Sequence, residues 1–174
     1  SLKLGLERVG AANSYHPVRD WLASLEWDGV ARLDDLVGRW IIPRDESNLS
    51  RTMGRKWMIS AAARGVRPGV QVDSVLILCG AKGIGKSSFF RSLACNPDWF
   101  SDSYLSIGSK DSDIALRGTW IRELAELEAI RKKDSATLKA WISRREDSYR
   151  PPYGYCEVTV PRGVVFCGSS NETA

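Results

Sequence analysis

The chain has 174 residues, of which 43% are hydrophobic and 26% are charged. This composition is typical of a globular protein with one domain or a small domain plus a partner. No apolar run approaches the roughly 20 residues that a membrane span needs. The first residues lack the apolar core and cleavage site of a signal peptide. The four cysteines form no C-x-x-C pair, which is typical of reduced thiols. We therefore expect a cytoplasmic protein with no membrane association.

The positive charge is concentrated in one stretch of the chain. The whole sequence has a net charge of +4. Residues 131–162 alone hold eight basic and four acidic residues, again a net charge of +4. The basic residues are Arg131, Lys132, Lys133, Lys139, Arg144, Arg145, Arg150 and Arg162. Such a local excess indicates a polyanionic partner.

The first 68 residues are predicted to be helical. A helix is expected to begin at His16-Pro17, because proline suits the first helical turn, and apolar residues follow at helical spacing up to Leu25. Similar patterns predict helices over 33–40 and 48–64. Arg67-Pro-Gly69 is a break, so we expect an all-α region at residues 1–68 and a nucleotide-binding core at 69–174.

A glycine-rich loop is the strongest motif in the chain. The pattern G-x-x-x-x-G-K-[ST] is met by Gly80, Gly85, Lys86 and Ser87. An apolar strand is predicted before it (75–79) and a helix after it (87–94). In such loops backbone N–H groups surround the phosphates, the lysine reaches the β- and γ-phosphates, and the hydroxyl binds Mg²⁺. The alternative is a glycine-rich turn followed by Lys-Ser by chance. The predicted nucleotide-binding residues are Gly80, Ala81, Lys82, Gly83, Ile84, Gly85, Lys86, Ser87 and Ser88.

Polar residues that follow two further predicted strands supply candidate catalytic groups. Glu123 ends a strand predicted over 118–124, and we assign it to the Mg²⁺ shell together with Ser87. Glu126 is assigned to orienting the attacking water. The alternative is that Glu126 and Glu128 are solvated charges on a short helix. Asn171 follows a strand predicted over 163–168 and is expected to contact the γ-phosphate or the water.

The basic stretch mixes cations, aromatic residues and turn formers. A helix is predicted from Ser135, with Lys139 and Arg144 off its apolar stripe. The following segment, 144–154, is predicted to be a loop or hairpin that tracks a phosphate backbone, with Tyr149 or Tyr153 able to stack on bases. An ordinary exposed basic loop is the alternative. The predicted nucleic-acid-binding residues are Lys139, Arg144, Arg145, Tyr149 and Arg150.

Several motifs occur together and in order. The motifs are His16-Pro-Val-Arg-Asp-Trp-Leu, Trp27-Asp-Gly, Arg32-Leu-Asp, the glycine-rich loop, Lys139-Ala-Trp-Ile-Ser-Arg, Asp147-Ser-Tyr-Arg-Pro-Pro-Tyr-Gly and Val164-Val-Phe-Cys-Gly-Ser-Ser-Asn. As a set they resemble the virulence-associated protein E family of phages, plasmids and pathogenicity islands, which is similar in turn to superfamily 3 replicative helicases.

The resemblance implies an α/β P-loop NTPase (AAA+-like) core with a parallel sheet, acting as a ring-shaped, ATP-driven motor on single-stranded or forked DNA. A primase module often accompanies it. The resemblance puts Walker A at Gly80 to Ser87, Walker B around Glu123 and Glu126, and a polar sensor at Asn171. Its DNA-contacting stretch would fall on residues 139–153. The chain ends soon after the sensor, at Ala174, so we expect a C-terminally truncated fragment of a longer protein. The arginine that completes a neighbour's site would lie beyond it.

Two other functions fit parts of the pattern. One is a P-loop kinase for a small molecule, with residues 144–150 as a lid over the phosphates. Its weakness is that no second substrate pocket is recognisable. The other is a nucleotide-gated DNA-binding scaffold with little turnover. A GTPase is disfavoured because the chain contains no N-K-x-D motif.

Overall fold

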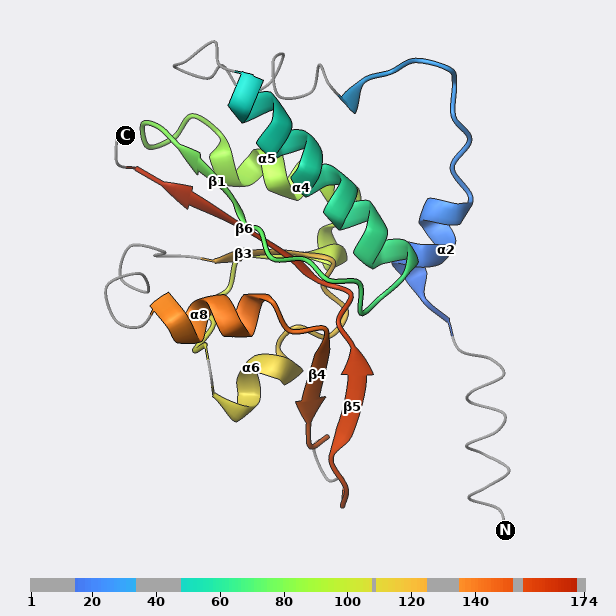
Figure 1. Cartoon of the computed structure of the whole chain (residues 1–174), viewed down its shortest axis with the longest axis vertical. Coiled ribbons are helices and arrows are strands. Elements are labelled where there is room, and N and C mark those ends of the chain that lie inside the picture. Colours follow the sequence, from blue (N-terminus) through green and yellow to red (C-terminus); the bar gives the residue numbers. More distant parts are fainter. Residues whose placement is uncertain (1–14, 34–47, 108, 125–134, 152–154, 172–174) are drawn as a thin grey trace.

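A four-stranded parallel sheet organises the molecule (Figure 1). The computed structural model describes residues 15–33, 48–107, 109–124, 135–151 and 155–171. The strands, in their order across the sheet, are β1 (Leu76–Cys79), β6 (Val165–Ser170), β3 (Ile121–Leu124) and β2 (Phe100–Ser101). All neighbouring strands run parallel, so their carboxyl ends meet at one edge of the sheet. The predicted α/β class with a parallel sheet is confirmed.

The helices lie close to their predicted positions. A helix predicted over 33–40 lies outside the described residues, and the two-residue strand β2 was not predicted. A short 3₁₀ helix, Pro97–Trp99, precedes β2. The helices are α2 (Pro17–Ala23), α4 (Asn48–Val66), α5 (Lys86–Leu93), α6 (Lys110–Ile114) and α8 (Ser135–Ile142).

One face of the sheet packs against α4 and α5, and α2 packs against α4 (Figure 1). Trp57 of α4 is 1% exposed, and its indole N–H donates to the carbonyl of Phe166 at 2.7 Å. Trp120, just before β3, donates in the same way to Ala61 at 2.8 Å. These bonds satisfy the polar ends of two large buried rings. The described part of the predicted helical region therefore shares a core with the sheet. A domain boundary at 68/69 stays a prediction.

The opposite face of the sheet packs against α8. Trp141 of α8 lies 4.7 Å from the ring of Phe166, measured between centroids. Val165 and Phe166 are neighbours on β6, and they belong to the hydrophobic clusters on opposite faces of the sheet. Successive side chains of a strand point to alternate faces, so this division is expected. Because both faces of β6 are covered, the chain is apolar at every position from Val164 to Cys167.

A two-stranded antiparallel pair projects from the body below the sheet (Figure 1). It consists of β4 (Glu146–Tyr149) and β5 (Val158–Pro161). Arg162 follows β5 and is fully buried, with its guanidinium bound to the carboxylate of Asp147 and to the carbonyls of Trp141 and Ile142. This contact fastens the base of the strand pair to α8.

A second buried arginine forms hydrogen bonds to three segments that lie far apart in the sequence. Arg64, near the end of α4, donates to the carbonyls of Val70, Val164 and Arg144 at 2.6–3.1 Å. Burial, with the nearby Arg162 charge, lowers the pKa of Arg64 to about 10. The side chain therefore stays protonated at neutral pH and keeps all three contacts. Among the described residues no helix is both long and apolar enough to cross a membrane.

Candidate nucleotide-binding site

The glycine-rich loop joins β1 to α5 at the edge of the sheet where the parallel strands end. Gly83 and Gly85 have φ angles of 87° and 89°, which residues with a Cβ rarely adopt. Gly85 is the N-cap of α5, so the free N–H groups of that helix point into the loop. The Gly80 N–H donates to the carbonyl of Ser170 at 3.2 Å. The loop is therefore anchored to β6 where it begins.

Lys86 connects the loop to the end of β6. Its ammonium donates to the carbonyls of Gly80 and Ala81, both at 2.9 Å, and to Oδ1 of Asn171 at 3.1 Å. An ammonium has three donors, and all three are used. An anion bound in the loop would take over some of these donors. Lys86 and Asn171 are 85 residues apart in the chain, and the parallel order of β1 and β6 brings them together.

A carboxylate lies beside the first turn of α5. Glu123 of β3 is 4% exposed, and its Oε1 accepts hydrogen bonds from Ser87 Oγ at 2.9 Å and Ser169 Oγ at 2.6 Å. Its Oε2 is buried and has no hydrogen-bond partner. A buried carboxylate oxygen without a partner is costly, and a cation at this point would satisfy it.

These residues fit a Mg²⁺ ion held together with a nucleotide. Hydroxyl and carboxylate oxygens are ligands that Mg²⁺ prefers, and Ser87 and Glu123 supply both. The described part of the chain contains no cluster of three or more His, Cys, Asp or Glu residues able to hold a metal. Mg²⁺ in nucleotide sites commonly uses one or two protein ligands and completes its shell with phosphate and water. The donor set therefore suits a Mg²⁺ ion that shares its shell with phosphate better than a dedicated metal centre.

The structure brings together four of the predicted site residues: Lys86, Ser87, Glu123 and Asn171. Glu126 lies outside the described residues, so its role stays a prediction. Ala81, Lys82, Ile84 and Ser88 are exposed along the loop and the start of α5. Ser169 was not predicted as a site residue. Its position near the end of an apolar strand at this edge of the sheet could have indicated it.

Four of the basic residues in the predicted nucleic-acid stretch are exposed, namely Lys139, Arg144, Arg145 and Arg150. The segment predicted to be a loop or hairpin, 144–154, contains β4, and the antiparallel partner of this strand, β5, lies beyond the predicted segment. Arg144 and Arg145 contact other parts of the protein. Arg144 lies 3.5 Å from the carboxylate of Asp113, and Arg145 Nε donates to the carbonyl of Gly69 at 2.8 Å. Arg162 is buried in the contact with Asp147 described above.

The stacking role predicted for Tyr149 does not fit the structure. Its side chain is 6% exposed, and the guanidinium of Arg117 lies over the ring at 5.3 Å. Exposed and buried residues alternate along β4, so Tyr149 points inward together with Asp147. The alternation of exposed and buried residues in a strand, which the sequence-based prediction did not use, would have placed Tyr149 on the inward face. Tyr153 lies outside the described residues.

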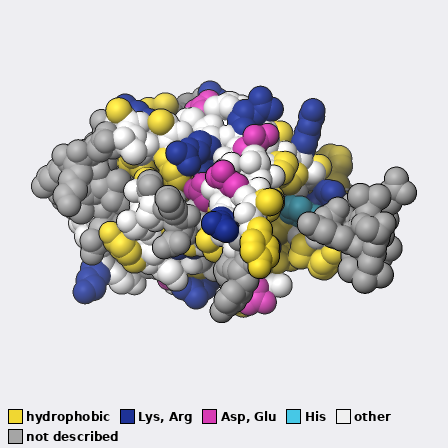
Figure 2. Space-filling model, turned by 90° about the horizontal axis from the view of Figure 1, so that it is seen from below, with side chains coloured by type: hydrophobic (Ala, Val, Ile, Leu, Met, Phe, Trp, Pro, Cys, Tyr) yellow, Lys and Arg dark blue, Asp and Glu magenta, His cyan; other side chains and the backbone are white. Residues whose placement is uncertain are grey.

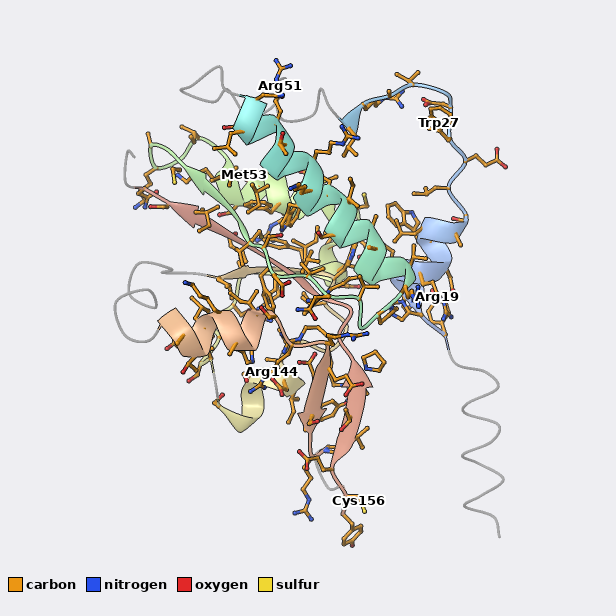
Figure 3. All side chains as sticks on the ribbon, in the orientation of Figure 1. Arg19, Trp27, Arg51, Met53, Arg144 and Cys156 are labelled. Carbon is orange, nitrogen blue, oxygen red and sulfur yellow. The ribbon has the colours of Figure 1, made fainter. Side chains whose placement is uncertain are left out.

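The exposed charges form a mixed surface rather than a continuous basic one. Figure 2 views the molecule from the side toward which β4 and β5 project, and Lys and Arg side chains alternate there with Asp and Glu. Figure 3 places Arg144 near the base of the β4–β5 pair. A nucleic acid bound to this face would therefore meet single Lys or Arg side chains with acidic residues between them.

The comparisons with known proteins identify the family of this chain. A family profile described as "Virulence-associated protein E-like domain" matches residues 22–174. The chain therefore belongs to the virulence-associated protein E-like family. No curated protein matches the chain.

Among solved structures, an apo A form of the NrS-1 C-terminal region is similar, with a TM-score of 0.56 and 20% identity over 92% of this chain. A second apo structure of the region, residues 305–718, has a TM-score of 0.53 and 17% sequence identity, and the match covers 91% of this chain. Each match covers 37% of that longer chain. At this identity the likeness shows the fold alone.

Proposed function

We propose that this chain is the ATP-binding module of a P-loop NTPase with an AAA+-like core, which hydrolyses ATP with Mg²⁺. The observation that carries the proposal is the convergence of Lys86, Ser87, Glu123 and Asn171 at one edge of the sheet. Two strands and a helix N-terminus supply these groups, and a glycine-rich loop lies beside them. A chance Lys-Ser after a glycine turn would not bring a buried carboxylate to the serine hydroxyl.

Each residue then has a defined task. Lys86 offsets phosphate charge, and backbone N–H groups of the loop and of α5 bind the phosphate oxygens. Ser87 and Glu123 hold the metal, and Asn171 orients the terminal phosphate or the water. Bound Mg²⁺ offsets charge on the phosphates during their transfer. Ser169 positions Glu123 through its hydrogen bond. Glu126 remains our candidate for orienting the water.

The biological setting comes from the family. We propose that the full protein is a replication helicase of a mobile genetic element that forms a homo-oligomeric ring on single-stranded or forked DNA, with a primase module as a possible partner. The proposal includes an arginine finger that one copy in the ring supplies to the site of its neighbour. A missing finger lowers turnover on the order of 10³-fold or more, so we expect a chain that is not assembled into the ring to hydrolyse ATP weakly.

ATP hydrolysis measured with and without single-stranded DNA tests the proposal. We expect slow, Mg²⁺-dependent turnover that DNA stimulates and that Glu123→Gln abolishes, because the metal ligand is weakened. Transfer of phosphate to a small molecule, with no DNA effect, would favour the kinase. Tight nucleotide binding without turnover, even in the assembled ring, would favour the scaffold.

DNA binding should depend on salt through the exposed arginines. Each phosphate neutralised on a single strand contributes roughly −0.7 to the slope of log affinity against log salt. We expect the double substitution Arg144→Ala and Arg145→Ala to make this slope shallower by about one to one and a half units. Fluorescence anisotropy over a salt series measures it.

Because Arg145 also binds the Gly69 carbonyl, the melting temperature of the double variant must be compared with that of the parent. Lys82→Gln is a matched control, since it removes an exposed cation from the glycine-rich loop. An unchanged slope in a folded double variant would remove these two arginines from the DNA path.

A further inference from the structure

Two hydroxyl groups converge on one oxygen of the buried carboxylate at the candidate site. The Oγ atoms of Ser87 and Ser169 lie 2.9 and 2.6 Å from Oε1 of Glu123. An ionised carboxylate accepts hydrogen bonds and donates none, so both serines donate to this oxygen. The other oxygen, Oε2, is buried and has no hydrogen-bond partner among the described residues. The two oxygens of Glu123 are therefore in different states.

The parallel sheet holds these side chains on one face. Glu123 of β3 lies opposite Cys167 of β6 in the register, and side chains at paired positions of a sheet point to the same face. Ser169 is two residues further along β6, so it shares that face. Helix α5 contacts both strands and brings Ser87 to the same carboxylate. Regular elements thus position both hydroxyl groups.

The buried thiol beside Glu123 is occupied with the backbone. Cys167 is 0% exposed, and its thiol donates to the carbonyl of Arg122 at 3.6 Å. The groups that meet the carboxylate of Glu123 by hydrogen bonds are therefore hydroxyls, which are hard oxygen donors. Such surroundings favour hard cations such as Mg²⁺ and Ca²⁺ over ions that prefer sulfur.

The two hydrogen bonds limit how Glu123 can bind a cation. A carboxylate oxygen has about two lone-pair positions, so an oxygen that accepts two hydroxyl protons has none left for a metal. Only Oε2 then remains, and ligation through one oxygen suits Mg²⁺, which requires an octahedral shell with bonds of about 2.0–2.1 Å. Ca²⁺ takes about six to eight oxygens at about 2.3–2.6 Å and often uses both oxygens of one carboxylate.

We propose that Ser169 is a specificity-determining residue, which makes the site prefer Mg²⁺ over Ca²⁺ by keeping Oε1 of Glu123 occupied. The inference rests on the proposed nucleotide site and adds the choice of cation. Ser87 is expected to bind the cation through its own oxygen, so Ser169 is the donor that acts on Glu123 alone. Without the Ser169 hydroxyl, Oε1 keeps one donor, and Glu123 is able to offer both oxygens to the larger ion.

A purely structural role for Ser169 predicts a different result. If its hydroxyl only satisfies a buried carboxylate, its loss lowers stability and weakens nucleotide binding by the same factor with either cation. Control of the carboxylate predicts unequal losses, because Mg²⁺ depends on ligation through one oxygen and Ca²⁺ gains a second ligand. The ratio of the two affinities separates these roles.

Calorimetric titration with a non-hydrolysable ATP analogue, in excess Mg²⁺ or in excess Ca²⁺, tests the proposal. The measured quantity is the dissociation constant with Ca²⁺ divided by that with Mg²⁺, which is expected to be well above one for the parent. Ser169→Ala is expected to weaken binding with Mg²⁺ about tenfold, as the loss of a group that orients a metal ligand does. Binding with Ca²⁺ is expected to weaken much less, so the ratio falls several-fold.

Three further variants separate the hydroxyl from the fold, and the melting temperature of each is compared with that of the parent. Ser169→Thr keeps a hydroxyl and should keep the parental ratio. Ser101→Ala is the matched control, because Ser101 ends β2 at the same edge of the sheet and its hydroxyl contacts Ser103. If Ser169→Ala does not fold, Ser169→Cys takes its place, since a thiol of similar size is only a weak donor.

The outcomes separate this inference from the proposed function. A lower ratio for Ser169→Ala, with parental ratios for Ser169→Thr and Ser101→Ala, supports the inference. An unchanged ratio in a folded variant, or a parental ratio near one, overturns it and leaves the nucleotide site in place. A parent protein that binds the analogue with neither cation overturns the inference and the proposed function together.

Discussion

Replacing Lys86 with alanine is expected to weaken Mg·ATP binding at least tenfold, which corresponds to about 1.4 kcal/mol. The ammonium is a compact charge with three donors, and a neutral side chain replaces neither its charge nor its hydrogen bonds. In the protein this ammonium binds the Gly80 and Ala81 carbonyls and Asn171, so it already lies at the centre of the loop. Isothermal titration calorimetry with Mg·ATP measures the change.

Lys82→Ala is the matched control for this experiment. Lys82 belongs to the same loop, but its side chain is exposed, and only its backbone is expected to contact phosphate. We therefore expect Lys82→Ala to bind Mg·ATP nearly as the parent does. Equal affinity of the parent and a folded Lys86→Ala variant would reject the assignment of this loop to nucleotide binding.

Replacing Asp147 with alanine is expected to destabilise the fold by about 3–5 kcal/mol, because it leaves the buried guanidinium of Arg162 without its counter-charge. Both side chains are almost inaccessible, at 0% exposure for Arg162 and 6% for Asp147. For a chain of this length the loss lowers the melting temperature on the order of 10 °C. Thermal unfolding followed by circular dichroism measures it.

Two comparisons make this result specific. Asp28 and Arg32 form an exposed pair of the same chemical type, so Asp28→Ala should leave the melting temperature almost unchanged. Adding Arg162→Met to the Asp147→Ala chain should recover part of the lost stability, because the unpaired charge is removed. A fall in melting temperature as small as that of Asp28→Ala would mean that the Arg162 contact does not hold the β4–β5 pair to α8.

The amino-acid sequence determined the parts of this protein that depend on local patterns. The spacing of Gly80, Gly85, Lys86 and Ser87 predicts a phosphate loop, because backbone conformation and phosphate geometry demand those residue types at that spacing. Apolar runs located the core strands, and helical periodicity located α4, α5 and α8. The polar residues Glu123 and Asn171 could be assigned to one site because the carboxyl ends of parallel strands share an edge.

Only the tertiary structure decided which side chains are accessible and which meet. Arg162 and Arg144 are equally basic in the sequence, yet one is buried on Asp147 and the other is half exposed. Tyr149 was predicted to stack on bases, but the pleat of β4 places its side chain on the inward face. Ser169 joined the site because β6 runs beside β3, which brings its hydroxyl to Glu123 across 46 residues of chain. Such contacts depend on the order of the strands and on the face of the sheet to which each side chain points. Both follow from how the whole core packs rather than from any local pattern.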